Sequence, residues 1–90
     1  MNTELAVKTT INDIEPKVDK NFQPYYQLSL RGFSNYFYAF SYNLSKETLR
    51  ILQETPEKFI NQLALIAYQE LEQKDKNGTF FKVREIQLIT

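Results

Sequence analysis

The sequence predicts a mainly β fold, a five-stranded barrel with one helix between the third and fourth strands. Stretches of alternating apolar and polar residues, rich in β-branched and aromatic side chains, recur along the chain as in half-buried strands. A stretch with helical spacing follows the first three of them, and an Asn-Gly pair, a strong hairpin signal, precedes the last. The chain has 90 residues, the size of one domain, so we expect residues 1–90 to form a single domain.

The first strand is predicted at Leu5–Ile14, where apolar and β-branched residues share one parity. Pro16 disfavours a regular continuation of this strand. The stretch Asp13–Pro24 is polar, which predicts a loop or a bent strand end before the next strand.

The second and third strands are predicted at Tyr25–Arg31 and Tyr36–Tyr42, which alternate and are rich in aromatic residues. A four-residue turn at Gly32–Asn35 is expected to join them.

A short helix is predicted at Leu44–Glu54, with Ser45 as its N-cap and an apolar stripe along one face. A second helix start is predicted at the following Thr-Pro-Glu sequence, with Thr55 as the cap and Pro56 at the first helical position.

The segment Leu63–Glu72 is ambiguous, because its Ala, Leu, Gln and Glu content favours a helix while its alternation also fits a strand. The predicted turn Lys74–Gly78 contains the Asn-Gly pair and would close a hairpin with a final strand at Thr79–Thr90, so a strand is preferred. The resulting order, β-β-β-α-β-β, is that of an OB-type barrel. The alternative, a helix over Pro56–Gln73, gives an open α+β sheet with the order β-β-β-α-α-β.

Composition excludes several kinds of site. The chain has neither Cys nor His, which rules out thiolate zinc sites, Ser-His-Asp triads and Cys-His dyads. We therefore expect no enzyme activity, no metal and no cofactor. No apolar run approaches the roughly 20 residues that span a bilayer, which predicts a cytoplasmic protein without a membrane partner. The net charge of zero argues against strong duplex-DNA binding but not against single-strand binding.

Nine of the 13 aromatic residues lie at positions 22–42. If Arg31 pairs with Tyr36, then Leu28 faces Ala39 on a buried side of the hairpin. The opposite side then carries Tyr25, Gln27, Ser29, Arg31, Tyr36, Tyr38, Phe40 and Tyr42. Such rings can stack nucleic-acid bases. Two other interpretations stay open: a register slip of one residue would bury these rings, and the helix or a second copy of the chain would cover them.

Two stretches resemble bacterial single-stranded DNA-binding proteins and the related primosomal replication protein. KDKNGTFFKVREIQLI at Lys74–Ile89 resembles their last hairpin, and INDIEPKVDKNFQPYYQLSL at Ile11–Leu30 resembles their first two strands with a polar loop between. The chain departs from the family in having no Trp and in lacking its strand glycines and its acidic, Pro-containing tail. The resemblance implies an OB-fold and a role in replication or mobile-element biology.

The sequence thus predicts a protein that binds single-stranded DNA, or RNA, by stacking bases on the second and third strands while Lys and Arg contact phosphates. The candidate binding residues are Lys17, Lys20, Tyr25, Gln27, Arg31, Tyr36, Tyr38, Phe40, Tyr42, Lys74, Lys76 and Lys82. The alternative is a protein-interaction or inhibitor module, including a homodimer formed through the aromatic sheet.

Overall fold

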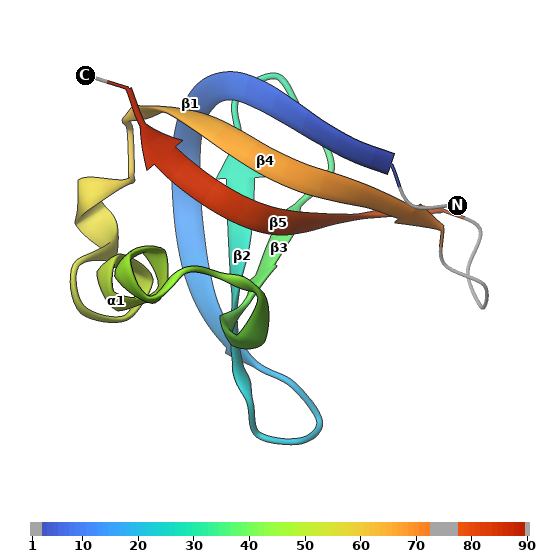
Figure 1. Ribbon diagram of the computed structural model, residues 1–90, viewed down its shortest axis with the longest axis vertical. Helices are drawn as coiled ribbons and strands as arrows, with labels where there is room; N and C mark the ends of the chain where they lie inside the picture. The colour runs from blue at the N-terminus through green and yellow to red at the C-terminus, as the bar shows by residue number, and fades with distance from the viewer. Residues whose placement is uncertain (1–2, 73–77, 90) are drawn as a thin grey trace.

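A computed structural model describes residues 3–72 and 78–89 and shows a closed five-stranded barrel with a helix between the third and fourth strands (Figure 1). The elements are β1 (Thr3–Val18), β2 (Pro24–Leu30), β3 (Phe37–Phe40), α1 (Lys46–Glu54), β4 (Leu63–Glu72) and β5 (Thr79–Leu88). The strand order is β1-β2-β3-β5-β4, with β4 returning to β1. Only the β3–β5 pair is parallel. The predicted fold class is confirmed, and this topology is consistent with an OB-fold.

Strand β1 is longer than the sequence predicted. It does not end at Ile14 but continues through Pro16 to Val18, and the predicted loop shrinks to residues 19–23. The first half of β1 pairs with β4 and the second half with β2, so the second half has a free edge. A proline is tolerated at such an edge, where no ladder hydrogen bond is required. The register shifts at Asn12, and a bulge of this kind bends a strand. The bend lets β1 pair with β4 along its first half and with β2 along its second half.

The β2–β3 register differs from the predicted one by two residues. Leu28 lies opposite Phe37 rather than Ala39, because the connection is longer than a four-residue turn. The Phe33 amide donates to the Leu30 carbonyl at 3.2 Å, and Gly32 adopts a φ of +89° that a glycine reaches without strain. A shift of two residues preserves the face of every side chain, so the predicted division into inner and outer residues holds.

Strand β3 is shorter than predicted at both ends. Tyr36 precedes it, and Tyr42 lies in the 3₁₀ turn Ser41–Asn43 that leads out of the sheet. The Asn43 side-chain amide donates to the Val83 carbonyl at 3.0 Å and fixes this turn against β5.

The predicted helix is confirmed as α1, and the Ser45 hydroxyl accepts the Thr48 amide at 3.2 Å as its N-cap. The second predicted helix start is only a single 3₁₀ turn, Pro56–Lys58, and the Thr55 side chain does not cap it. The Thr55 amide instead donates to the Ile51 carbonyl and closes α1. The chain then enters β4, so the alternative of a helix over this region is wrong.

Strand β4 pairs with β1 on one side and β5 on the other, which confirms the prediction of a strand at Leu63–Glu72. Ala64, Ile66 and Tyr68 point into the barrel, whereas Leu63 and Leu65 remain partly exposed. Most of the predicted turn before β5 lies outside the described residues. Strand β5 begins where predicted but ends at Leu88.

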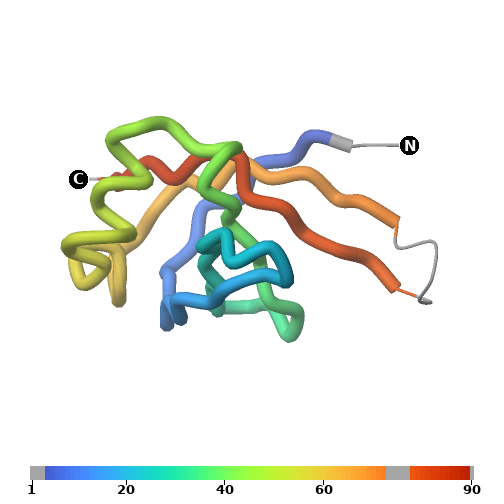
Figure 2. The backbone as a smooth tube through the Cα atoms, turned by 90° about the horizontal axis from the view of Figure 1, so that it is seen from below, coloured from blue at the N-terminus to red at the C-terminus, as the bar shows by residue number. Residues whose placement is uncertain are grey.

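The barrel interior is centred on Phe37, which is fully buried. Its ring stacks on Phe81 at a centroid distance of 4.8 Å and meets Tyr68 edge-on at 4.9 Å. Leu52 of α1 and Phe59 after it are also buried. The helix lies at one end of the molecule, and the distal ends of β4 and β5 project on the opposite side (Figures 1 and 2).

Tyr26 provides a pH-dependent test of this core. Its side chain is buried, and the burial raises the pKa of its hydroxyl above the ordinary tyrosine value. The unfolded chain therefore loses this proton at lower pH than the folded chain, and stability falls as the pH rises above about 10. In urea unfolding at a series of alkaline pH values, Tyr26→Phe should show a shallower decline than the wild type. Parallel declines would contradict the assignment.

Candidate functional site

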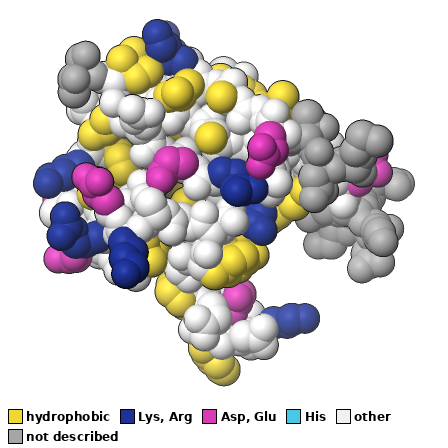
Figure 3. Space-filling view, viewed as in Figure 1, with side chains coloured by type: hydrophobic (Ala, Val, Ile, Leu, Met, Phe, Trp, Pro, Cys, Tyr) yellow, Lys and Arg dark blue, Asp and Glu magenta, His cyan; other side chains and the backbone are white. Residues whose placement is uncertain are grey.

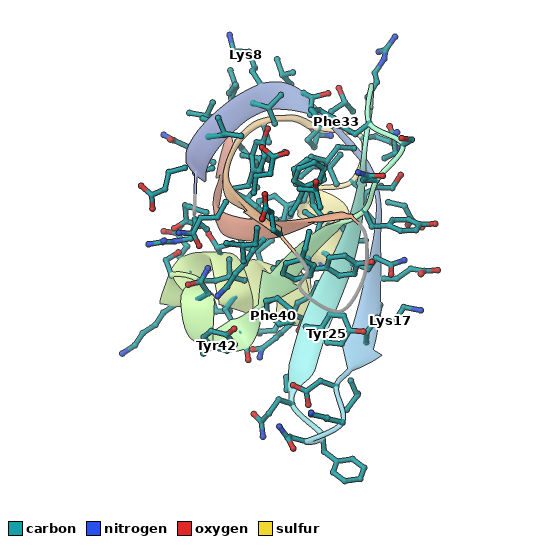
Figure 4. The ribbon with its side chains drawn as sticks, turned by 90° about the vertical axis from the view of Figure 1, so that its right-hand side faces the viewer. Lys8, Lys17, Tyr25, Phe33, Phe40 and Tyr42 are labelled. Atoms are coloured by element: carbon teal, nitrogen blue, oxygen red, sulfur yellow. The ribbon has the colours of Figure 1, made fainter. Side chains whose placement is uncertain are left out.

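Five aromatic rings and one lysine gather on the outer side of β2, β3 and β5. We call this the aromatic surface; its members are Tyr25, Tyr38, Phe40, Tyr42, Phe80 and Lys82. The members on strands point outward because strand side chains alternate and their neighbours Tyr26, Phe37 and Phe81 point inward. Tyr42 follows them in the 3₁₀ turn after β3. Figure 4 shows the labelled Tyr25, Phe40 and Tyr42 at the same end of the barrel, with Lys17 close to Tyr25.

Phe40 is the central ring of the aromatic surface. Its centroid lies 5.5 Å from Tyr25, 5.7 Å from Tyr42 and 5.9 Å from Phe80. Tyr38 stacks on Phe80 at 5.1 Å with an interplanar angle of 13°. The rings therefore form one continuous apolar patch across three strands, at the separations that favour aromatic pairs.

All five rings retain contact with solvent. Tyr42 is 77% exposed, and the other four are intermediate between buried and exposed. The one-residue slip that would bury these rings does not occur, and Phe37 fills the core instead. Contiguous exposed aromatic groups of this kind mark a surface suited to a binding partner.

Lys82 brings a positive charge to the aromatic surface. Its Nζ lies 4.9 Å from the centroid of the Tyr42 ring and 5.9 Å from that of Phe40, within cation–π range. Its backbone pairs with Tyr38 in the parallel β3–β5 ladder. An ammonium group at this position can meet an anionic group of a ligand whose flat parts lie on the rings.

Phe80 is the member that the sequence analysis missed. Phe80 and Lys82 point outward from β5, whereas Phe81 and Val83, which alternate with them, point inward. That alternation was visible in the sequence. The missing information was the pairing of β5 with β3, which brings Phe80 onto Tyr38.

Two further predicted residues lie beside the aromatic surface and share an acidic neighbour. Lys17 pairs with Tyr25 across the β1–β2 ladder, and Gln27 pairs with Glu15. The Lys17 Nζ lies 3.5 Å from the Glu15 carboxylate, which also accepts the Gln27 side-chain amide at 3.3 Å. Glu15 therefore offsets part of the positive charge on this side.

The remaining predicted residues are more scattered. Lys20 lies in the β1–β2 loop, and Arg31 follows the far end of β2, about 20 Å along the strand from Tyr25. Tyr36 lines a hollow of about 240 Å³ together with Tyr38 and Phe80, at the edge of the aromatic surface. Lys74 and Lys76 lie outside the described residues.

Charge is not concentrated on the face that Figure 3 presents, where acidic and basic side chains alternate. Within residues 3–72 and 78–89, no group of three or more His, Cys, Asp or Glu residues could hold a metal ion. None of the helices in this part of the chain is long and apolar enough to cross a bilayer. No protein family, curated protein or solved structure matches the chain.

Proposed function

We propose that this protein binds single-stranded nucleic acid on the aromatic surface and catalyses no reaction. The observation that carries the proposal is the continuous patch of five partly exposed rings, flanked by the ammonium group of Lys82. Three of the five rings, those of Tyr25, Tyr38 and Phe40, lie on the second and third strands of a barrel consistent with an OB-fold. These two strands form the face that binds oligonucleotides in such barrels. The proposed ligand is single-stranded DNA, in replication or mobile-element biology. RNA is the alternative ligand, and its affinity is to be compared with that of DNA.

Stacking supplies most of the affinity in this proposal. Bases lie on Phe40, Phe80 and Tyr38, and each stacked base contributes about 1–3 kcal/mol. Every base has a flat face, so we expect little sequence preference. Lys82 contacts a phosphate directly, and Lys17 contacts one once it releases Glu15.

Fluorescence anisotropy with a labelled oligo-dT at two salt concentrations tests the proposal. Two phosphate contacts would lower affinity only about sevenfold between 50 and 200 mM salt, since each contributes a slope of about −0.7 on a log–log plot. We expect binding at micromolar protein with this shallow dependence. A matched oligo-rU compares RNA with DNA, and a duplex of equal length should bind more weakly. No binding of oligo-dT at micromolar protein would refute the proposal.

The second candidate function is a protein-interaction or inhibitor module, including a homodimer formed through the aromatic surface. The 77% exposure of Tyr42 favours it, because exposed aromatic residues are also typical of protein interfaces. Light scattering after size-exclusion chromatography distinguishes the two functions. A dimer that Phe40→Ala converts to a monomer would support the module, and a wild-type monomer would refute the homodimer.

A further inference from the structure

The loop between β1 and β2 carries an exposed apolar tip. The loop projects away from the barrel in two perpendicular views (Figures 1 and 4). Phe22 is 86% exposed, and Val18 at the base of the loop is 62% exposed. Figure 3 shows hydrophobic atoms at the end of this projection, with a basic and an acidic side chain behind them. Contacts within the fold therefore do not explain a phenylalanine at position 22.

The backbone at Phe22 is also unfavourable for a large residue. Its φ of 62° lies in the left-handed region, which glycine adopts freely and bulky side chains rarely adopt. Strained residues of this kind persist where the surrounding structure fixes them, and they concentrate at functional positions.

Asp19 fixes the loop. Its carboxylate Oδ1 accepts the amides of Asn21 at 2.8 Å and Gln23 at 2.9 Å. Its carbonyl accepts the Phe22 amide at 3.0 Å, and its amide donates to the Gln23 carbonyl at 3.0 Å. The Asp19 side chain is thus engaged with backbone amides, and the backbone that carries Phe22 is held in place before any ligand arrives.

We propose that Phe22 is a wedge that unstacks the first base pair where a duplex meets the single strand on the aromatic surface. This inference rests on the proposed function. The loop directly extends the β1–β2 ladder, in which Lys17 pairs with Tyr25 of that surface. Lys20, exposed in the same loop, suits a polyanion next to the apolar ring. Apolar side chains inserted between base steps open them in this way.

A forked DNA with 2-aminopurine at the first paired position tests the wedge, because unstacking raises the fluorescence of that base. The wild type should raise the fluorescence, and Phe22→Gly should abolish the rise. Glycine fits the left-handed φ, so this variant should fold at least as stably as the wild type. Phe22→Trp, which keeps a flat ring, should retain the signal.

Oligo-dT binding by the same proteins separates the wedge from the proposed function. The affinity of Phe22→Gly for oligo-dT should fall by less than about fivefold, which is the loss expected when one stacked base is removed. If the wild type binds oligo-dT but Phe22→Gly opens the fork equally well, the wedge is refuted and the aromatic surface stands. If the wild type binds no oligo-dT but opens the fork through Phe22, the proposed function fails, and only the unstacking of the base pair by Phe22 stands. Absence of both signals refutes both.

Discussion

Replacing Phe37 by alanine is expected to lower the free energy of unfolding by about 3–5 kcal/mol, the range for truncating a buried phenylalanine. The ring has no exposed surface, and its contacts with Phe81, Tyr68 and Phe33 join four parts of the chain. Truncation leaves a cavity that these rings cannot fill without moving. Urea unfolding followed by circular dichroism measures the loss.

The same substitution at Phe22 is the matched control for Phe37→Ala. Phe22 is 86% exposed, and the change there should alter stability by no more than about 0.5 kcal/mol. If Phe37→Ala leaves too little folded protein to measure, Phe37→Leu should give a smaller loss in the same direction. Equal stability of the Phe37 and Phe22 variants would contradict the central position of Phe37 in the core.

Phe40→Ala is expected to reduce affinity for oligo-dT by about 5-fold to 150-fold, the equivalent of the 1–3 kcal/mol contributed by one stacked base. The ring contacts Tyr25, Tyr42 and Phe80, so its loss divides the aromatic surface. Anisotropy titrations at the lower salt concentration give the affinities, and circular dichroism confirms that the variant remains folded.

Leu65→Ala is the control for this loss of affinity. Leu65 is 39% exposed on the outer side of β4, away from the aromatic surface, and its truncation should leave affinity unchanged. If Phe40→Ala binds as tightly as the wild type, the ligand site lies elsewhere on the molecule.

Strand β4 shows how much of the fold could be predicted from the sequence. The composition of Leu63–Glu72 favours a helix, and its periodicity permits either structure. The neighbouring Asn-Gly pair indicated a hairpin and so a strand. The outcome follows from tertiary context, since β1 and β5 pair with both edges of this segment.

The hairpin of β2 and β3 shows why the candidate site could be predicted in part. The pairing was wrong by two residues, yet Tyr25, Tyr38 and Phe40 lie on the predicted face because strand side chains alternate with a period of two. Local alternation therefore determines the face of a residue even where the turn geometry is misjudged.

Contacts between distant parts of the chain could not be predicted in this way. The stacking of Phe80 on Tyr38 depends on a parallel pairing between strands that are separated by α1 and β4. The continuation of β1 through Pro16 depends on the free edge of that half of the strand. Neither feature has a signal in the local sequence.

The parallel pairing of β3 with β5 has a consequence for how binding affects the barrel itself. Two residue pairs, Phe37 with Phe81 and Tyr38 with Lys82, join these strands. Every other pair of neighbouring strands shares more residue pairs, so the β3–β5 pairing is the weakest in the closed sheet. Across this pairing, the Phe80 ring stacks on Tyr38 and its centroid lies 5.9 Å from that of Phe40. Bases stacked on these rings would hold β3 and β5 together, and the free energy of unfolding would rise with the ligand concentration.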